Sequence, residues 1–432
     1  METLSVVIKV LTILLSLCCA YQMFYIFVIW HQMLKDKRHP DHSPKPEPLG
    51  RYAVLVCARN EQVVIGDLVQ SICNQDYPAD KLTAFVMADN CTDHTALRAL
   101  EAGAVVYERH DTTHVGKGYA LDALLGHIRE DYPDGFDGYV VFDADNILKP
   151  DYIRNLDIMF QKGHDIITSY RNSKNFGASW LAGGCGMNFI RESRYLNQAR
   201  FQLGASAFVS GTGFAFSRKI YEEMGGWPYH LISEDMEFTV DQISKGRKVA
   251  FAADSEFYDE QPRTFRQSWR QRSRWMKGTM QVFYRYRKPL WKSMISGNWA
   301  SIDLFIYSIP MFLLTSLIFC LNFILGVMVS NADQSIWGFL RVVGGHLIGM
   351  YVGLLFSSAS AMLTEYKKII APSWKKILYT FTFPLYVFTY IPLAPIALCR
   401  RLSWTPISHT VTADSLPSTM VDKRLAEKER VA

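Results

Sequence analysis

The stretch that decides the fold is GYVVFDADN, Gly138 to Asn146, in which an apolar run ends in two aspartates separated by one residue. Its β-branched and aromatic residues predict a buried strand over Gly138 to Asp143. Alternation of such runs with helical stretches is the sequence form of parallel βα units, so we expect an α/β domain over residues 51–262. Three similar runs precede this one, at Tyr52 to Cys57, Thr83 to Ala88 and Ala104 to Tyr107.

Acidic residues stand where these predicted strands end. Glu61 follows the first run, Asp89 ends the second, and Asp143 and Asp145 close the fourth. Ligands of open α/β sheets bind at the carboxyl ends of the strands. An Asp-x-Asp pair offers hard oxygen ligands for Mg²⁺ or Mn²⁺, which can grip a diphosphate. Two aspartates at a strand-to-helix turn can equally serve as cap and turn residues.

Two motifs further along the chain are candidates for chemistry. The residues Ser233 to Asp235 open an expected helix, where they are either an N-cap with its acidic first turn or a base for an acceptor hydroxyl. Gln271, Arg274 and Trp275 are spaced i, i+3 and i+4, so they share one face of a helix. They lie within residues 263–298, a basic and aromatic-rich stretch for which we expect amphipathic helices at a membrane interface.

The ends of the chain are apolar, although 20% of all residues are charged and the mean hydropathy is +0.01. Leu4 to Trp30 carries a single charge, at Lys9, and as a helix it exceeds a bilayer core of about 30 Å. We expect residues 1–34 to be a retained transmembrane helix, because the run is too long for a cleaved signal peptide. Lys35, Lys37 and Arg38 follow it and favour a cytosolic location for the next domain.

Residues 299–400 are expected to form a second transmembrane module. Two apolar runs, Ile302 to Val329 and Ile336 to Leu363, predict a helical hairpin. A last run, Ile377 to Cys399, holds three prolines and basic residues at both ends, so it is either a straight span or a re-entrant hairpin with both ends cytosolic; we expect the hairpin. Residues 35–50 are expected to be a linker and residues 401–432 a cytosolic polar tail.

Composition excludes several classes of protein. The eight cysteines form no CxxC pair, which predicts reduced thiols rather than a disulfide framework or a zinc site. The net charge of +5 is modest for 432 residues, and no dense basic arm is present, so we expect no nucleic-acid partner.

The motifs, in this order, resemble the family 2 glycosyltransferases, in particular their membrane-integrated processive branch of cellulose, hyaluronan, chitin and poly-N-acetylglucosamine synthases. The resemblance covers about residues 50–400 and implies a GT-A fold, which is a Rossmann-like nucleotide-sugar-binding domain, joined here to an α-helical transmembrane module. The motifs that carry it are the Asp after the second strand, Asp-x-Asp, Ser/Thr-Glu-Asp and Gln-x-x-Arg-Trp, matched by Asp89, Asp143 with Asp145, Ser233 to Asp235, and Gln271 with Arg274 and Trp275.

The resemblance implies a role for each motif. Asp235, with Glu234 beside it, would be the catalytic base of an inverting transfer from UDP-glucose or UDP-N-acetylglucosamine. Asp143 and Asp145 would bind Mg²⁺ or Mn²⁺, and Trp275 would stack under the acceptor sugar. The donor would be bound by Glu61, Asp89, Lys117, Asp143, Asp145, Gln271 and Arg274.

Two further segments resemble parts of these enzymes more loosely. Gly211, Thr212 and Gly213 match a small-residue segment that borders the acceptor pocket, but a plain turn before a short strand explains them equally well. Trp404 to Ile407 is similar to a Trp-containing segment near the donor site, and a surface anchor for the tail explains it as well.

The leading hypothesis is a processive, multi-pass glycosyltransferase of the cell membrane, with a cytosolic catalytic domain, that elongates a polysaccharide coupled to export. The alternatives are addition of one sugar to a lipid-linked acceptor and a catalytically silent export subunit that binds nucleotide sugars. The expected partners are a UDP-sugar, a glycan or glycolipid acceptor and the bilayer, with a homo-oligomer or an export partner as candidates to complete the export path. Asp89 is followed by Asn-Cys-Thr-Asp where Gly-Ser-x-Asp is common, so the motifs leave the sugar open.

Overall fold

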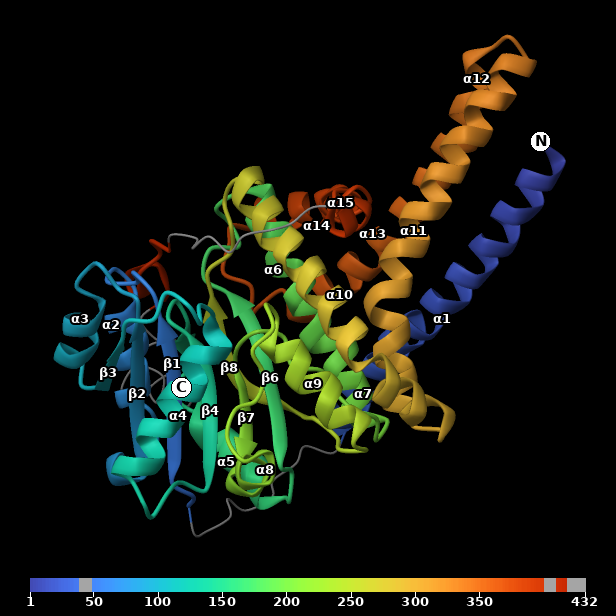
Figure 1. Cartoon of the computed structure of the whole chain (residues 1–432). Coiled ribbons are helices and arrows are strands. Elements are labelled where there is room, and N and C mark those ends of the chain that lie inside the picture. Colours follow the sequence, from blue (N-terminus) through green and yellow to red (C-terminus); the bar gives the residue numbers. More distant parts are fainter. Residues whose placement is uncertain (39–48, 400–408, 418–432) are drawn as a thin grey trace.

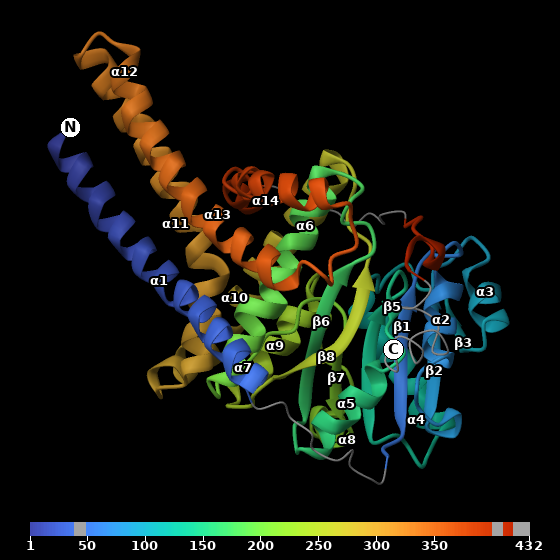
Figure 2. The same ribbon diagram turned by 180° about the vertical axis from the view of Figure 1, so that it is seen from behind.

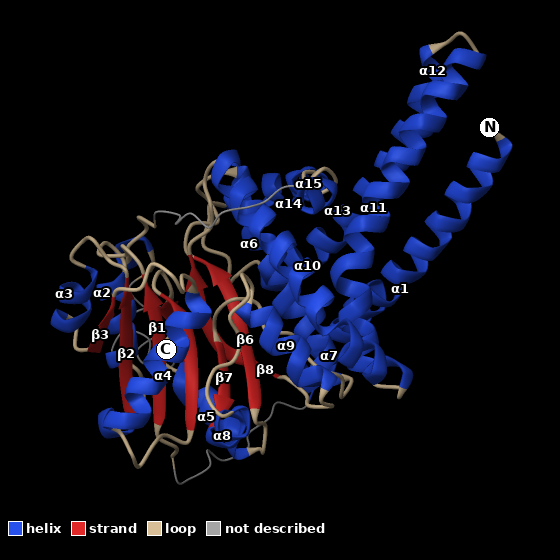
Figure 3. Cartoon of the chain, in the orientation of Figure 1, coloured by secondary structure: helices blue, strands red, loops and turns tan. Residues whose placement is uncertain are grey.

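The computed structural model describes residues 1–38, 49–399 and 409–417 of the protein. Figure 1 shows a sheet-containing body from which long helices project on one side, and Figure 3 shows that the projecting part contains helices and short loops but no strand. The first helix, α1 (Glu2–Arg38), runs beside α11 (Trp299–Ala332), although the two are far apart in the sequence. The protein therefore consists of a mixed α/β domain and a bundle of helices, and both the N-terminal and the C-terminal parts of the chain contribute helices to the bundle.

The α/β domain is built on one eight-stranded sheet with the strand order β3-β2-β1-β4-β7-β6-β8-β5. The first four strands pair in parallel as β3-β2-β1-β4, and β7 then runs antiparallel to both β4 and β6. The predicted strands are confirmed within two residues at each end, whereas β5, β6 and β8 are not apparent from the sequence. The strands are β1 (Tyr52–Ala58), β2 (Leu82–Asp89), β3 (Val105–Arg109), β4 (Gly138–Asp143), β5 (Ile147–Leu148), β6 (Ile166–Ser173), β7 (Phe214–Ser217) and β8 (Ala250–Asp259).

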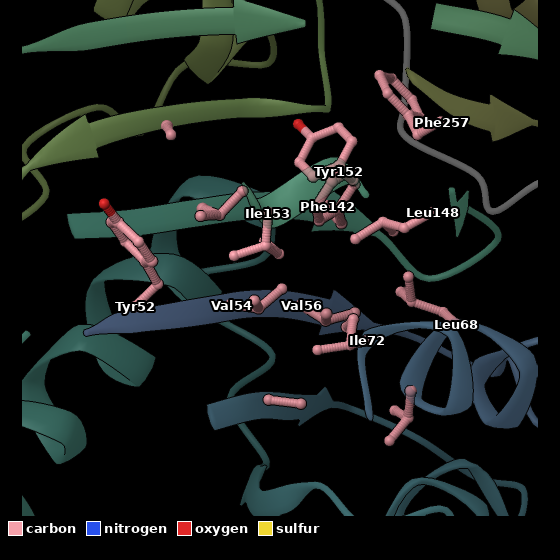
Figure 4. Close-up of a cluster of buried hydrophobic side chains, with 14 of the residues drawn as sticks. Tyr52, Val54, Val56, Leu68, Ile72, Phe142, Leu148, Tyr152, Ile153 and Phe257 are labelled. Carbon is pink, nitrogen blue, oxygen red and sulfur yellow. The ribbon is translucent and has the colours of Figure 1, made fainter. Parts of the chain in front are cut away.

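Helices cover both faces of this sheet because successive side chains of a strand point to opposite faces. On β1, Val54 and Val56 pack into a core with Leu68 and Ile153, which Figure 4 shows in close-up. The intervening Leu55 faces the opposite core. The helices of the domain are α2 (Ile65–Cys73), α3 (Thr95–Glu101), α4 (Lys117–Asp131), α5 (Tyr152–Gln161), α6 (Trp180–Arg191), α7 (Gln198–Gln202), α8 (Arg218–Met224) and α9 (Glu234–Ser244), and α10 (Phe265–Ile295) leads into the bundle.

Four helices in the described part of the chain are long and apolar enough to cross a membrane: Glu2–Lys35, Phe312–Ala332, Ile336–Glu365 and Ser373–Ile396. The third is continuous from α12 (Ile336–Phe339) through a π-helical turn, Leu340–Gly344, into α13 (Gly345–Glu365). The apolar runs predicted to span lie largely within the first three of these helices. The protein therefore has the helices that a membrane anchor at both ends requires.

The last apolar run is broken into α14 (Ser373–Phe388) and α15 (Leu393–Cys399). In Figures 1 and 2, α14 lies across the direction of α11 and α13. One face of α14 exposes a stripe of large apolar side chains, Trp374, Ile377, Leu378, Phe381 and Leu385. An amphipathic helix lying across the spanning direction suits a membrane interface, and its orientation there stays a prediction.

A buried ion pair ties the N-terminal helix to the rest of the protein. Arg200 Nε lies 2.8 Å from Asp303 Oδ2 at the start of α11, and neither side chain is exposed. The hydroxyls of Tyr21 and Tyr25 on α1 donate to the same carboxylate, at 2.9 and 3.3 Å. Because Tyr25, Arg200 and Asp303 are buried and bonded to one another, α1, α7 and α11 are held in one register.

The segment 409–417 packs back on the α/β domain. The backbone N–H groups of Thr410 and Val411 donate to Glu260 Oε2 at 3.0 and 2.8 Å, and that of Ala413 donates to Asp67 Oδ2 at 2.6 Å. This part of the expected polar tail is therefore docked. Trp404 to Ile407, most of the expected linker and the remainder of the tail lie outside the described residues.

Candidate active site

A cavity of about 410 Å³ opens at the carboxyl ends of β1, β2 and β4 and extends toward α10, α11 and the turn between α14 and α15. Thr212 and Gly213, two of the three small residues predicted at the acceptor site, are absent from its lining. Eleven residues singled out from the sequence line it: Glu61, Asp89, Lys117, Asp143, Asp145, Gly211, Glu234, Asp235, Gln271, Arg274 and Trp275.

Lys117 is the cation at the centre of this cavity. It is the first residue of α4, and its Nζ lies 2.5 Å from Asp143 Oδ1, 2.8 Å from the Gly211 carbonyl oxygen and 3.7 Å from Glu234 Oε1. Burial alone would lower the pKa of Lys117, but Asp143 and Glu234 outweigh burial and raise it. The side chain therefore stays charged and neutralises the acidic residues around it.

Asp145 is held rigidly at the bottom of the cavity. Its side chain is buried, and its Oδ2 accepts a hydrogen bond of 2.9 Å from the backbone N–H of Glu260. Burial raises the pKa of the neighbouring Asp259 to about 6, which Arg171 opposes and Asp145 reinforces. Asp145 and Asp259 are therefore two buried acidic residues that lie close to a single guanidinium, that of Arg171.

Thr212 and Gly213 shape the site without lining it. The Thr212 hydroxyl accepts from the Asp143 backbone N–H at 2.9 Å and donates to Asn146 Oδ1 at 2.5 Å, so it holds the turn between the two aspartates. Gly213 has a φ of +64°, and a Cβ there would lie 2.1 Å from the Phe257 ring. Packing and backbone conformation therefore account for this glycine.

Asp143 and Asp145 suit a divalent cation that also binds phosphate, because carboxylate oxygens are the ligands that Mg²⁺ and Mn²⁺ prefer. Within the described ranges, no three His, Cys, Asp or Glu side chains gather closely enough to hold a metal ion by themselves. The two aspartates would therefore share the ion with the diphosphate of a nucleotide, as Mg²⁺ sites in proteins commonly do.

Asp235 lies in the first turn of α9, beside the aspartate pair. Its Oδ2 accepts a hydrogen bond of 2.6 Å from the backbone N–H of Gly211. Burial raises the pKa of Asp235, while N–H groups and Lys117 oppose the shift. Burial likewise raises the pKa of Glu234 to about 7, against the effect of Lys117. Asp235 is partly exposed to the cavity, and a carboxylate with a raised pKa and a fixed orientation is suited to accept a proton there.

The helix α10 brings Gln271, Arg274 and Trp275 to the opposite wall of the cavity. It can do so because Gly278 has no side chain: a Cβ there would lie 2.0 Å from Ser233 Oγ. The close approach of α10 to Ser233 sets the distance between Asp235 and the α10 side chains. Arg274 forms no hydrogen bond or ion pair with any described residue, so its charge is available in the cavity.

Two acidic residues that line the cavity, Asp89 and Glu61, are paired with basic side chains. Asp89 Oδ1 lies 2.5 Å from Arg109 Nη1. Glu61 Oε1 lies 2.9 Å from the Nδ1 atom of His409, which comes from the docked tail. Burial alone would lower the pKa of His409, but Asp145 and Glu61 outweigh it and raise the pKa to about 10. The tail therefore brings a positive charge to the acidic site, which no sequence motif indicated.

The other end of the cavity is aromatic. The ring of Trp275 packs edge-on against Phe189, 5.7 Å between centroids, and the ring of Phe312 stacks on Tyr390 at 5.5 Å. Arg272 was not among the residues predicted at the site. It is fully buried, and its guanidinium lies over the Tyr390 ring, 4.6 Å from the ring centroid. The cavity thus joins a charged end at the sheet to an aromatic end at the helical bundle.

Comparison with known proteins places these features in context. A family model described as "Glycosyltransferase like family 2" matches residues 48–278. A probable glycosyltransferase of Bacillus subtilis, YdaM, is 25% identical over 338 residues, which are 74% of each chain. A beta-monoglucosyldiacylglycerol synthase of Synechocystis is 25% identical over 400 residues, 87% of this chain and 78% of that protein. Glucomannan 4-beta-mannosyltransferase 2 of Arabidopsis thaliana is 24% identical, over 78% of this chain and 66% of its own.

One solved structure shares the fold over most of its length. It is the mannosyltransferase PcManGT of Pyrobaculum calidifontis in complex with GDP-Man and Mn²⁺, with a TM-score of 0.52 at 17% sequence identity. The match covers 90% of this chain and 98% of that one. At this identity the likeness concerns the fold, and it confirms the predicted GT-A class for the α/β domain.

Proposed function

Because the chain belongs to glycosyltransferase family 2, whose model matches more than half of its 432 residues, we propose that it transfers a sugar from a UDP-sugar, with inversion, to a hydroxyl group of a membrane-borne acceptor. The observation that carries the proposal is the position of Asp235, which lies in one cavity with Lys117 and the aspartate pair on one side and Trp275 on the other. That position suits a base between a donor and an acceptor.

In this reaction Asp235 accepts the proton of the acceptor hydroxyl as the hydroxyl oxygen attacks the anomeric carbon. The bond from that carbon to the diphosphate oxygen breaks on the opposite face, so an α-linked donor gives a β-linked product. Lys117 and Arg274 balance the charge of the departing diphosphate. A divalent cation on Asp143 and Asp145 would add Lewis-acid stabilisation of that charge.

The donor assignment rests on both the motifs and the site. The order of the motifs resembles that of UDP-dependent enzymes, and Glu61 with Asp89 would bind the nucleoside. The related mannosyltransferase was solved with GDP-Man and Mn²⁺, so a guanosine donor belongs in any test. Lys35 and the basic residues after it favour a cytosolic position for the site, where nucleotide sugars are made available.

The acceptor has two candidate forms. The resemblance to polysaccharide synthases implies processive growth of a chain coupled to export. Addition of one sugar to a lipid-linked acceptor is the alternative. Only a minority of the side chains of α1 and of α12–α13 are buried within the described chain, so lipid can contact both helices. Named relatives include both a glycolipid synthase and a glucomannan synthase.

A donor panel on membranes that contain the full chain tests the proposal. Radiolabelled UDP-glucose, UDP-N-acetylglucosamine and GDP-mannose are supplied with Mg²⁺ or Mn²⁺, and the products are sized. We expect metal-dependent release of nucleoside diphosphate and a labelled product in the membrane fraction. Long polymer identifies processive growth, and a single added sugar identifies the lipid-linked form. No release of nucleoside diphosphate from any donor would overturn the proposal in favour of a silent nucleotide-sugar-binding subunit.

A further inference from the structure

One carboxylate in the cavity has no part in the reaction described above. Glu192 begins a π-helical segment, Glu192–Asn197, that joins α6 to α7, and it lines the cavity toward the aromatic end. π-Helical turns inside helices are frequent at functional sites, because the extra residue redirects a side chain. No sequence motif singled out this residue.

The surroundings of Glu192 are those of a binding group rather than of a structural ion pair. Within the described ranges, no basic side chain lies within 4.0 Å of its carboxylate. Burial raises the pKa of Glu192, while the nearby Ser210 hydroxyl and Arg171 oppose the shift. An ionised carboxylate has about four acceptor positions, and because this side chain lines the cavity, that capacity is available to a bound molecule.

Arg171 connects the Glu192 segment to the segment that holds the proposed base. Its backbone N–H donates to the hydroxyl of Ser193, the residue after Glu192, and its guanidinium donates to the Ser210 carbonyl oxygen at 3.0 Å. The next residue, Gly211, donates its backbone N–H to Asp235. Glu192 lines the same cavity as Asp235 and as the aromatic residues Tyr307 and Tyr390.

We propose that Glu192 binds the acceptor, by accepting a hydrogen bond from a hydroxyl other than the one that attacks, and so selects acceptors that already carry a sugar. The proposal rests on the proposed function and specifies its acceptor. Diacylglycerol has a single free hydroxyl, which Asp235 would engage, so it would leave Glu192 in the cavity without a substrate partner. A site built to bind a substrate hydroxyl strongly rejects the analogue that lacks it, because a polar group of the site is then left unpaired when the substrate displaces water.

The test uses the full chain in lipid nanodiscs with the donor that supports turnover. The acceptors are dioleoylglycerol, glucosyl-dioleoylglycerol and cellotetraose, and the variants are Glu192→Ala and Glu192→Gln. We expect wild type to prefer a glycosylated acceptor. Loss of a charged hydrogen bond should lower kcat/KM for that acceptor about 10- to 100-fold in Glu192→Ala, mainly through KM. The donor KM, donor hydrolysis and affinity for the nucleoside diphosphate should be unchanged, which also shows that the variants are folded.

Glu365→Gln is the matched control. Glu365 is a buried glutamate outside the cavity, and its Oε1 lies 2.9 Å from Arg194 Nε in the same π-helical segment. This variant should leave the acceptor KM unchanged, whereas an equal change would show that Glu192 only supports the segment. An unchanged acceptor KM in both Glu192 variants, or a wild type that prefers dioleoylglycerol, would overturn the proposal. A wild type that turns over no donor would instead contradict the proposed function, and the proposal with it.

Discussion

Asp235 and Gly211 are joined by a hydrogen bond of 2.6 Å from the Gly211 backbone N–H to one carboxylate oxygen. The same glycine presents its carbonyl oxygen to Lys117, 2.8 Å away. One residue therefore orients both the proposed base and Lys117, the cation that we propose to face the diphosphate. Because Gly211 has a φ of +80°, a side chain there would strain the backbone that carries these two contacts.

Replacing Asp235 by Asn should remove the base and leave the shape of the site intact. We expect turnover to fall by about 10²- to 10⁴-fold, the usual contribution of a general base. Affinity for the nucleoside diphosphate, measured by calorimetry, should stay close to that of wild type. The matched control is Asp241→Asn on the same helix, whose carboxylate binds Tyr229 and Lys245 away from the cavity. Retained turnover in Asp235→Asn would assign the base to another residue.

The pH dependence of kcat should show an acid limb above the usual range of an aspartate. Burial raises the pKa of Asp235, and a base is active only when deprotonated, so activity should fall as the pH drops through that raised value. Glu234, with a pKa of about 7, is the competing assignment. In Glu234→Gln the limb should persist. Its disappearance in this variant, or a constant kcat down to about pH 4, close to the usual aspartate pKa, would contradict the assignment.

The docked tail should contribute to donor binding through His409. Replacing it by Ala leaves Glu61 without its partner beside Asp145, and the added negative charge should repel a diphosphate. We expect the donor KM to rise about tenfold, the value of one charged hydrogen bond, with little change in the acceptor KM. His409→Lys keeps the positive charge and should recover part of the loss. An Ala variant with an unchanged donor KM would show that the tail only covers the domain.

Gly278 should be intolerant of even one methyl group. In Gly278→Ala the new Cβ would meet Ser233 Oγ at 2.0 Å, so α10 or the Ser233 turn must shift. Overpacking of this kind costs about 1–3 kcal/mol, and the displaced Trp275 should also raise the acceptor KM. Gly126→Ala is the control, because nothing lies within 4 Å of a Cβ in the middle of α4. That variant should be stabilised by about 0.5–1 kcal/mol in thermal unfolding, as expected for Gly to Ala in a helix.

The half of the cavity that we propose to bind the donor could be predicted from the sequence because its residues directly follow apolar strands. The runs that end at Asp89 and Asp143 show where those strands stop, and parallel pairing brings their ends together. The strand β6 is different, since its eight residues are all buried and yet include Ser169, Arg171 and Asn172. These polar residues interrupt the apolar pattern by which a strand is recognised, and one of them, Arg171, lines the cavity.

Other parts of the site depend on contacts that no local pattern encodes. His409 is 348 residues from Glu61 in the sequence, and only the path of the tail brings them together. The role of Glu192 follows from a π-helical turn, which has no residue signature of its own. Thr212 and Gly213 were predicted by resemblance to lie at the acceptor site, but contacts with Asn146 and Phe257 account for both.

The buried cluster of Arg200, Asp303 and the two α1 tyrosines bears on how the protein is made. Tyr21 leaves the ribosome 282 residues before Asp303, its partner. During that interval α1 can enter the bilayer, but its final register must wait until the α/β domain has folded around Arg200 and α11 has emerged. In the order of synthesis, α1 is therefore made first, but it reaches its fixed position in the structure only after α11 has been made.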